Sequence, residues 1–292
     1  MNKIFKKAVC TVLSLTAVAG AAFSMSACTT DHPEVELSIS FNGSTYTLDY
    51  KLYRKYAPNT VNHFIKLAEN GYYDGLCVHD YDDSRLYTGA YSYDKANAAT
   101  DGGLTYKSYY EVVKGYSDFP HSVWLYSGKN TPTYTLYGEF SANGLKVENG
   151  TFLQQSYGSL TMYYTDKGDK EATVSVEKIN GTGETTKNYE YNSATSQFFI
   201  ALNTTSKTVN TQCTFATLMD DSKEQLNKLV DAIKAYIETN FSSADDPNAE
   251  FVEEVTLDID EDDHFVGEDG READYKVPVE PIVVKSVKVT KY

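Results

Sequence analysis

The residues of greatest chemical interest stand in a short apolar stretch, 196–202, with the sequence Ser-Gln-Phe-Phe-Ile-Ala-Leu. The stretch contains no glycine or proline, and its composition predicts a buried central strand. Side chains alternate along a strand, so Phe198 and Ile200 would enter a core while Gln197 and Phe199 share the opposite face. A carboxamide beside an aromatic ring provides an apolar wall, a hydrogen-bond donor and an acceptor, which a small pocket for a peptide requires. The simpler alternative is a core strand in which Gln197 is hydrogen-bonded.

An acidic run closer to the C-terminal end, Asp258–Asp263 followed by Glu268 and Asp269, suggests a calcium site. An EF-hand loop counted from Asp258 needs Gly at its sixth position and Glu at its twelfth, whereas this chain has Asp at both. We therefore expect a solvated acidic loop, with a looser calcium site as the alternative. The sequence contains no Ser/His/Asp arrangement, zinc-ligand spacing or phosphate-binding loop, so it predicts no metal and no cofactor.

The first residues of the chain are typical of an export signal. A short head with three lysines precedes an apolar stretch, Ala8–Phe23, and a run of small residues; the stretch is too short for a membrane-spanning helix. Residues 25–28, Met-Ser-Ala-Cys, resemble a lipoprotein signal-peptidase box, in which Cys28 becomes the acylated first residue. Ordinary cleavage before Cys28 is the alternative. We expect a signal peptide at 1–27, an anchor linker at 28–34, and a location on the extracytoplasmic face of the cell membrane.

Charge and cysteine content limit the partners of the protein. The formal net charge is −15, and the only charged side chains of the expected signal peptide are basic, so the mature chain is more acidic still. Such a chain avoids nucleic acid and anionic lipid, which leaves the lipid anchor as its only membrane contact. Cys77 and Cys213 both lie in predicted strand regions, and they are either two buried free thiols or a disulfide in an exported protein.

Local patterns predict the framework that must position these residues. Residues 35–41 and 45–50 alternate apolar and polar side chains around Asn42-Gly43, which is the strongest hairpin signal in the chain. A helix is expected from Pro58 to just before Gly71. Its apolar stripe comprises Val61, Phe64, Ile65 and Ala68.

Two further elements are predicted later in the chain. Residues 173–176 and Asn180-Gly181 suggest an extra hairpin. Ser222 and Gln225 form a capping-box pattern at the start of a second helix. One face of that helix would carry Leu226, Leu229, Val230, Ile233 and Ile237.

Seven segments follow one another in the order found in one protein family. They are 57–64, 71–75, 78–79, 137–140, 158–162, 196–200 and 281–287. On these segments the chain resembles the cyclophilin-type peptidyl-prolyl isomerases, in the form of a bacterial lipoprotein with insertions. The resemblance implies a mostly β fold over 35–292, a closed antiparallel β-barrel capped by helices. Its large loop insertions would lie at about 92–133, 165–192 and 242–277.

The resemblance also implies a chemistry. Rotation of an X-Pro amide has a barrier of about 20 kcal/mol and needs no nucleophile or metal. A catalyst holds the proline ring in an apolar pocket and places a hydrogen-bond donor on the nitrogen as it becomes pyramidal. In the family the donor is an arginine directly after a Phe-His pair. Here the pair is Val78-His79 and the next residue is Asp80, so an anion stands where the cation is expected.

The other groove positions are partly kept. An ungapped comparison implies a substrate groove formed by Gln197, Phe199, Leu86, Thr88 and Gln212. The departures are Thr88 for a glutamine, Tyr163-Tyr164 for Ala-Asn, Lys207 for a tryptophan, Thr208 for a leucine and Gln212 for a histidine. Arg85 has a groove-facing position in the same comparison. Its guanidinium would replace the missing donor from the opposite strand or pair with Asp80.

These observations leave three functions open. The resemblance implies a prolyl isomerase at the cell surface, with a proline-containing peptide or an exported protein as its client. Asp80 favours instead a binding module that captures such peptides through Gln197 and Phe199 with little turnover. The third function is a structural envelope protein in which the insertions bind a partner.

Overall fold

The computed structural model describes residues 30–97, 102–119, 121–140, 153–163, 173–178, 182–188, 193–203, 211–259 and 271–292. Several predictions from the sequence concern residues outside these ranges. They are the signal peptide, Cys28, Tyr164, Lys207, Thr208 and most of the acidic run 258–269. No helix among the described residues has the length and apolar character needed to cross a bilayer.

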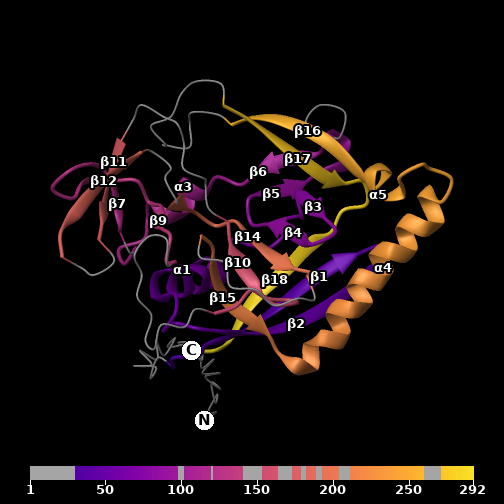
Figure 1. The fold of residues 1–292 in the computed structure, drawn as a ribbon, viewed down its shortest axis with the longest axis horizontal. Helices are drawn as coiled ribbons and strands as arrows, with labels where there is room; N and C mark the ends of the chain where they lie inside the picture. The colour runs from indigo at the N-terminus through magenta and orange to yellow at the C-terminus, as the bar shows by residue number, and fades with distance from the viewer. Residues whose placement is uncertain are drawn as a thin grey trace, which may run out of the picture.

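The described residues form a largely β molecule whose main sheet is antiparallel and strongly curled (Figure 1). Its eight strands, in order across the sheet, are β18 (Val283–Lys291), β1 (Glu34–Phe41), β2 (Ser44–Leu52), β15 (Cys213–Leu218), β10 (Leu160–Met162), β14 (Phe198–Ala201), β4 (Arg85–Thr88) and β3 (Asp80–Asp82). The segment before β3 bonds to the start of β18, through a bridge between Cys77 and Val283 and an N–H···O bond from Val78 to Ile282 of 2.8 Å. The two edges of the sheet therefore meet, and the predicted closed antiparallel barrel is confirmed.

The remaining elements surround this barrel. The helices are α1 (Pro58–Glu69), α3 (Tyr109–Val113), α4 (Lys223–Phe241) and α5 (Pro247–Glu250), with short 3₁₀ turns η1 (Lys95–Asn97) and η4 (Asp220–Ser222). The small sheets are β5 (Tyr91–Tyr93) with β6 (Leu104–Tyr106), β9 (Leu136–Tyr137) with β13 (Ser193–Ala194), β16 (Val252–Ile259) with β17 (Arg271–Pro278), and the four strands β12 (Glu184–Asn188), β11 (Thr173–Glu177), β7 (Val123–Tyr126) and β8 (Asn130–Pro132). In Figure 1 the four-stranded sheet stands at the left, α4 at the right and the β16–β17 hairpin at the top.

The first predicted hairpin forms with the expected turn. β1 and β2 pair from Glu34 with Lys51 to Phe41 with Ser44. Only Asn42 and Gly43 lie between the paired ends, and both have positive φ, 44° and 77°. This is the conformation that a two-residue hairpin turn requires and that Asn-Gly adopts at little cost.

The predicted helix from Pro58 is α1, and its N-terminus is capped from a distant part of the chain. Ala57, at the cap position, makes no side-chain cap. Instead Glu139, only 6% exposed, accepts the N–H of Asn59 at 3.1 Å and that of Thr60 at 2.8 Å with its two carboxylate oxygens. Burial raises the pKa of Glu139, while these backbone N–H groups act in the opposite direction. A buried acid thus satisfies two N–H groups that the helix itself leaves unpaired.

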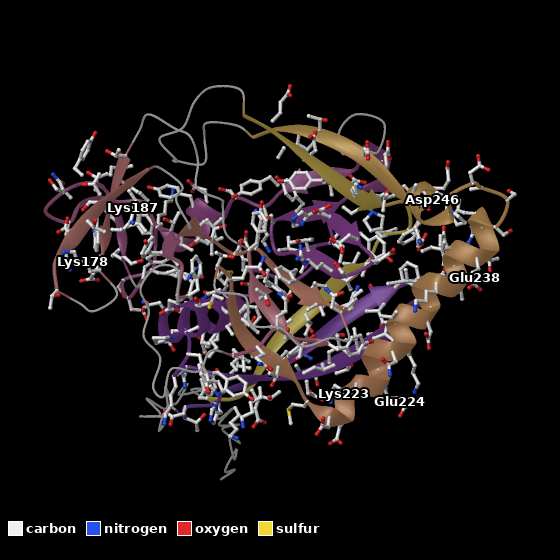
Figure 2. All side chains as sticks on the ribbon, in the orientation of Figure 1. Lys178, Lys187, Lys223, Glu224, Glu238 and Asp246 are labelled. Carbon is white, nitrogen blue, oxygen red and sulfur yellow. The ribbon has the colours of Figure 1, made fainter. Side chains whose placement is uncertain are left out.

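The predicted second helix is α4, but its capping box does not form. Leu226, Leu229, Ile233 and Ile237 are buried as expected. Ser222 makes no side-chain cap on the helix; its hydroxyl accepts the N–H of Asp49 at 2.8 Å and donates to the Asp49 carboxylate at 3.1 Å. The serine therefore joins α4 to β2, because a tertiary partner competes with the local capping bond. The outer side of α4 carries charged side chains such as Glu224 and Glu238 (Figure 2).

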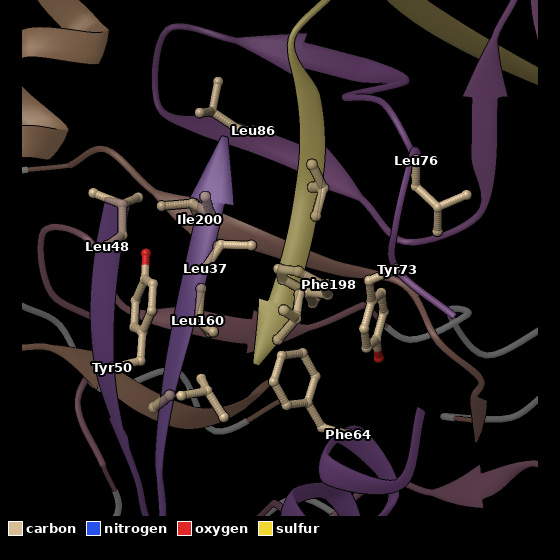
Figure 3. Packing of buried hydrophobic residues seen from close by; sticks show 14 of the residues in the cluster. Leu37, Leu48, Tyr50, Phe64, Tyr73, Leu76, Leu86, Leu160, Phe198 and Ile200 are labelled. Carbon is tan, nitrogen blue, oxygen red and sulfur yellow. The ribbon is translucent and has the colours of Figure 1, made fainter. Parts of the chain in front are cut away.

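The barrel core is dominated by aromatic rings that contact α1. Phe64 of α1 lies 5.4 Å from Phe198, 5.1 Å from Phe215 and 5.0 Å from Tyr73, measured between ring centroids. Figure 3 shows Phe64 and Tyr73 beside the aliphatic side chains of the sheet. These contacts fix the helix against the inner face of the sheet.

Two predicted insertions combine into one sheet. The hairpin predicted at 173–176 is β11 paired with β12, and β11 also pairs with β7 from the stretch 92–133. Val123, Val174 and Val176 form a small buried cluster of this sheet together with Tyr137. The four-stranded sheet is thus built from both stretches.

We predict that Glu139→Ala lowers the free energy of unfolding by about 1–2 kcal/mol, because two buried N–H groups of α1 lose their acceptor. Urea unfolding followed by circular dichroism measures the change. Glu111→Ala is the matched control, since among the described residues Glu111 makes an exposed ion pair with Lys114, worth at most about 0.5 kcal/mol. Equal effects of the two substitutions would contradict the capping role.

Candidate functional site

The face predicted for Phe199 is confirmed. Phe198 and Ile200 belong to the barrel core, whereas Phe199 lies on the other side of β14. There its ring is 5.1 Å from the ring of Tyr87, and the guanidinium carbon of Arg85 is 5.2 Å from its centroid. An aromatic floor and a cation therefore lie together on the outer face of the barrel, which we call the Phe199 face.

The register of β3 and β4 decides which side chains reach this face. Asp82 pairs with Arg85, so only two residues form the turn between the strands. On the other side of β4, Tyr87 pairs with Phe199. Cross-strand partners share a face of the sheet, so Arg85 and Tyr87 accompany Phe199.

Two predicted groove residues consequently lie elsewhere. Leu86 is 0% exposed and packs in the barrel core (Figure 3), where it is paired with Ile200. Thr88 is buried and donates its hydroxyl to the carbonyl of Cys77 at 2.7 Å. The placement of Leu86 and Thr88 in the groove is therefore corrected. An ungapped comparison assumes a fixed turn length, and a shift of one residue moves every side chain to the opposite face.

The guanidinium of Arg85 lies over the aromatic floor, with its carbon 5.9 Å from the Tyr87 centroid and 5.2 Å from the Phe199 centroid. Its Nη1 donates to the Tyr87 hydroxyl at 2.8 Å, while its Nε is buried and bonds to none of the described residues. No ion pair between Arg85 and Asp80 forms in the described part of the chain. Phe199 itself is only 1% exposed. A guanidinium with an unused donor is thus held against the floor by cation–π contact.

Gln197 is paired with a buried histidine. The Nε2 atom of His79 lies 3.2 Å from the Oε1 atom of Gln197. His79 is 1% exposed, between the rings of Tyr91 at 5.0 Å and Tyr275 at 5.3 Å. Burial lowers its pKa to about 4, although the contact with Gln197 acts in the opposite direction. His79 is therefore neutral at pH 7 and acts as a packed hydrogen-bonding group.

Gln212 joins a row of polar side chains beside the floor. Thr161 of β10 is the cross-strand partner of Phe199, and its hydroxyl lies 3.0 Å from that of Thr214. Gln155 donates to Thr161 at 3.4 Å and to Oε1 of Gln212 at 3.2 Å. Sequence reasoning missed Gln155, because only the strand pairing shows that its neighbour Thr161 borders the floor.

Asp80, at the position of the expected arginine, has a structural partner. Its Oδ1 accepts the backbone N–H of Lys276 in β17 at 3.1 Å. Burial raises the pKa of Asp80, and the bond from Lys276 acts in the opposite direction. The carboxylate thus holds an element that comes from far along the chain.

Neither a disulfide nor a cluster of potential metal ligands occurs among the described residues. Cys77 and Cys213 are buried thiols that form no disulfide with each other. Burial raises the pKa of Cys77 to about 12, so this thiol is unreactive at neutral pH. The described residues hold no group of three or more His, Cys, Asp or Glu side chains that could bind a metal ion.

Residues 37–252 match the family model of the cyclophilin type peptidyl-prolyl cis-trans isomerase/CLD. The chain belongs to this family. The match spans most of the barrel and every residue of the Phe199 face, so the predicted family is confirmed. A search of curated proteins gives no match.

Solved cyclophilin structures are similar to this chain. A cyclophilin type isomerase from Cryptosporidium parvum has 15% sequence identity and a TM-score of 0.41, over 89% of this chain and 99% of that chain. The same kind of protein has also been solved in the presence of the dipeptide Ala-Pro, at 14% identity, a TM-score of 0.41 and the same coverage. The Mimivirus cyclophilin has 13% identity and a TM-score of 0.42, over 90% of this chain and 91% of that chain.

We predict that His79 makes folding stability depend on pH. The pKa of His79 falls from 6.5 to about 4 on folding, so its contribution is complete above pH 6.5 and is lost as the pH falls toward 4. Within this window the free energy of unfolding should decrease by about 1.4 kcal/mol per pH unit on account of His79. Urea unfolding between pH 7 and 5 should show a shallower slope in His79→Gln. An unchanged slope would mean that folding does not lower the pKa of His79.

Proposed function

We propose that this protein is an active peptidyl-prolyl cis-trans isomerase in which Arg85, on β4, supplies the cation that the family places after the Phe-His pair. The single observation that carries the proposal is the guanidinium of Arg85, 5.2 Å from the centroid of Phe199. The floor and the donor of the reaction are thus adjacent, although the donor comes from the other strand. This arrangement supports turnover despite Asp80.

The proposed reaction needs one movement of Arg85. A proline ring reaches Phe199 only after the guanidinium has turned aside, because it covers the floor. The long stem of Arg85 permits that rotation, and the displaced guanidinium stays beside the bound proline. Its Nε or Nη groups then donate to the prolyl nitrogen as the amide twists and the nitrogen gains a lone pair, which lowers a barrier of about 20 kcal/mol. No covalent bond forms or breaks.

Gln197 and the neighbouring polar row would hold the peptide backbone. With its Oε1 atom at His79, the carboxamide of Gln197 presents its donor end next to the floor, and Gln212 extends the polar groups beyond Thr161. A proline-containing segment of an exported protein, bound in an extended form, is the substrate that we propose. We further propose that the protein works at the extracytoplasmic face of the cell membrane, held there by a lipid on Cys28.

A second function is favoured by a specific observation. Phe199 is 1% exposed, so the floor is covered in the free protein and the cost of moving Arg85 reduces affinity and rate alike. If that cost is high, the protein is a peptide-binding lipoprotein with little turnover. The two functions differ in whether Arg85 accelerates rotation.

We predict that Arg85→Ala lowers kcat/KM for a proline-containing peptide by about 10²–10³-fold, the usual effect of removing one preorganised donor. Arg85→Lys should retain part of the rate, since it keeps a cation without the planar fork. A protease-coupled isomerase assay on the purified protein measures both. Arg54→Ala is the matched control, because Arg54 bonds to Asn62 and the Thr30 carbonyl, away from the floor.

A wild-type rate equal to the uncatalysed rate, together with measurable peptide binding, would establish the second function instead. If the wild type is active and Arg85→Ala leaves its rate unchanged, the protein is an isomerase but Arg85 has no part in its mechanism.

We predict that Cys28→Ser moves the protein from the membrane pellet to the soluble fraction, because a cysteine thiol is needed to carry the lipid. Fractionation and immunoblotting measure the distribution, with Cys77→Ser as the control. Membrane retention of Cys28→Ser would contradict lipid anchoring at this residue.

A further inference from the structure

The β16–β17 hairpin packs firmly on the barrel beside the Phe199 face. Val255 of β16 and Val277 of β17 are 7% and 3% exposed. They form a hydrophobic cluster of their own with Cys77, Ala90 and Tyr91. The hairpin therefore lies against the segments that lead into β3 and out of β4, as Figure 1 shows.

One side chain of this hairpin, Tyr275, contacts the histidine that pairs with Gln197. The ring of Tyr275 packs edge-on against His79 with 5.3 Å between centroids, and its hydroxyl lies 3.0 Å from that of Tyr91. Tyr91 contacts the histidine as well, at 5.0 Å. Two tyrosines thus fix the plane of the His79 ring, and its Nε2 in turn contacts Gln197 at 3.2 Å.

Asp80 binds the same hairpin one residue further along. Its carboxylate accepts the N–H of Lys276, which follows Tyr275 directly. His79 and Asp80 are consecutive in the chain, and Tyr275 and Lys276 are consecutive on β17, so two adjacent contacts set the position of β17 on β3. Asp80, which stands where the family has an arginine, therefore binds the hairpin through Lys276.

We propose that the β16–β17 hairpin is a positioning element of the isomerase groove, held by Asp80 and acting through Tyr275 and His79 on the carboxamide of Gln197. Asp80 and Tyr275 are positioning residues, because neither needs to touch the peptide. The inference rests on the proposed function for its kinetic effect, but the orientation of Gln197 can be measured without turnover.

The physical reason lies in the terminal torsion of the Gln197 side chain. A carboxamide can turn about its terminal torsion and exchange its donor for its acceptor. A fixed His79 holds one end of the amide, so the other end presents a constant hydrogen-bonding group to the peptide. If His79 tilts, the amide turns and binding weakens in the ground state and the transition state equally. Such uniform loss raises KM while kcat stays nearly constant.

The first experiment tests the anchor by hydrogen exchange of the Lys276 amide, read by NMR on the full protein. Asp80→Asn keeps an acceptor and should keep the protection of this amide, whereas Asp80→Ala should lose it. Thr256→Ala is the matched control on the same hairpin, since Thr256 is exposed and bonds to Asp274 away from β3. Equal protection in Asp80→Ala and wild type would overturn the anchor.

The second experiment tests the relay to Gln197. Tyr275→Ala and Asp80→Ala should each shift the side-chain amide signal of Gln197 and raise KM about three- to tenfold, the effect of one lost hydrogen bond. Tyr275→Phe keeps the ring and should leave both quantities near wild type. Two independent variants keep the test decisive if one of them folds poorly.

The outcomes separate this inference from the proposed function. If the Gln197 signal is unmoved in both alanine variants, the positioning role is wrong whatever the activity. If the signal moves but wild type lacks activity, the proposed function fails while the positioning role stands for peptide binding. Asp80→Arg should lower activity, since it removes the acceptor for Lys276. An increase in its rate would show that position 80 is an unfilled catalytic site and would overturn the positioning role of Asp80.

Discussion

The pairing of β4 between β3 and β14 is the constraint on which the site depends. A two-residue turn sets β4 against β3, and the ladder with β14 sets Tyr87 against Phe199. Because strand side chains alternate with a period of two, these pairings leave no freedom in which residues lie outside the barrel. Arg85 and Tyr87 reach the floor, and Leu86 completes the core. The side chains of the Phe199 face are thus decided by backbone geometry.

This strand pairing connects two departures from the family's pattern that look independent in the sequence. Asp80 replaces the family's cation on β3, and Arg85 places a cation on β4. The anion is bound to the backbone of β17, whereas the cation rests on Phe199. A charge of each sign therefore lies near the floor in a chain with a net charge of −15. The hairpin that binds Asp80 belongs to the third predicted insertion, so the strand that carries Asp80 and this insertion are physically connected.

Elements determined by neighbouring residues could be predicted from the sequence. Asn42-Gly43 specifies its hairpin, Pro58 starts α1, and the alternation of residues 197–200 assigns Phe199 to the outer face. Contacts between distant segments could not be predicted in the same way. The partner of Asp80 lies 196 positions further along the chain, and the cap of α1 comes from Glu139, 80 positions after Asn59.

Other errors arose where local and tertiary bonds compete. Ser222 fits a capping box, but Asp49 of β2 takes its hydroxyl. The faces of Leu86 and Thr88 could not be predicted for a different reason. An ungapped comparison carries no information on the length of the turn between β3 and β4. The polar row of Gln155 and Gln212 depends on the pairing of β10 with β14 and β15, which no single stretch of sequence contains.

The closure of the barrel has a consequence for biogenesis. β1, near the start of the described chain, pairs with β18 at its end, and the bonds between residues 76–78 and 282–284 complete the ring. These strands are far apart in the sequence, so the entropy of loop closure makes their pairing one of the slower contacts to form. Until it forms, β1 presents an unpaired edge, which is the kind of surface that pairs with foreign strands. Folding therefore passes through an incomplete cylinder that is open to association with neighbouring molecules.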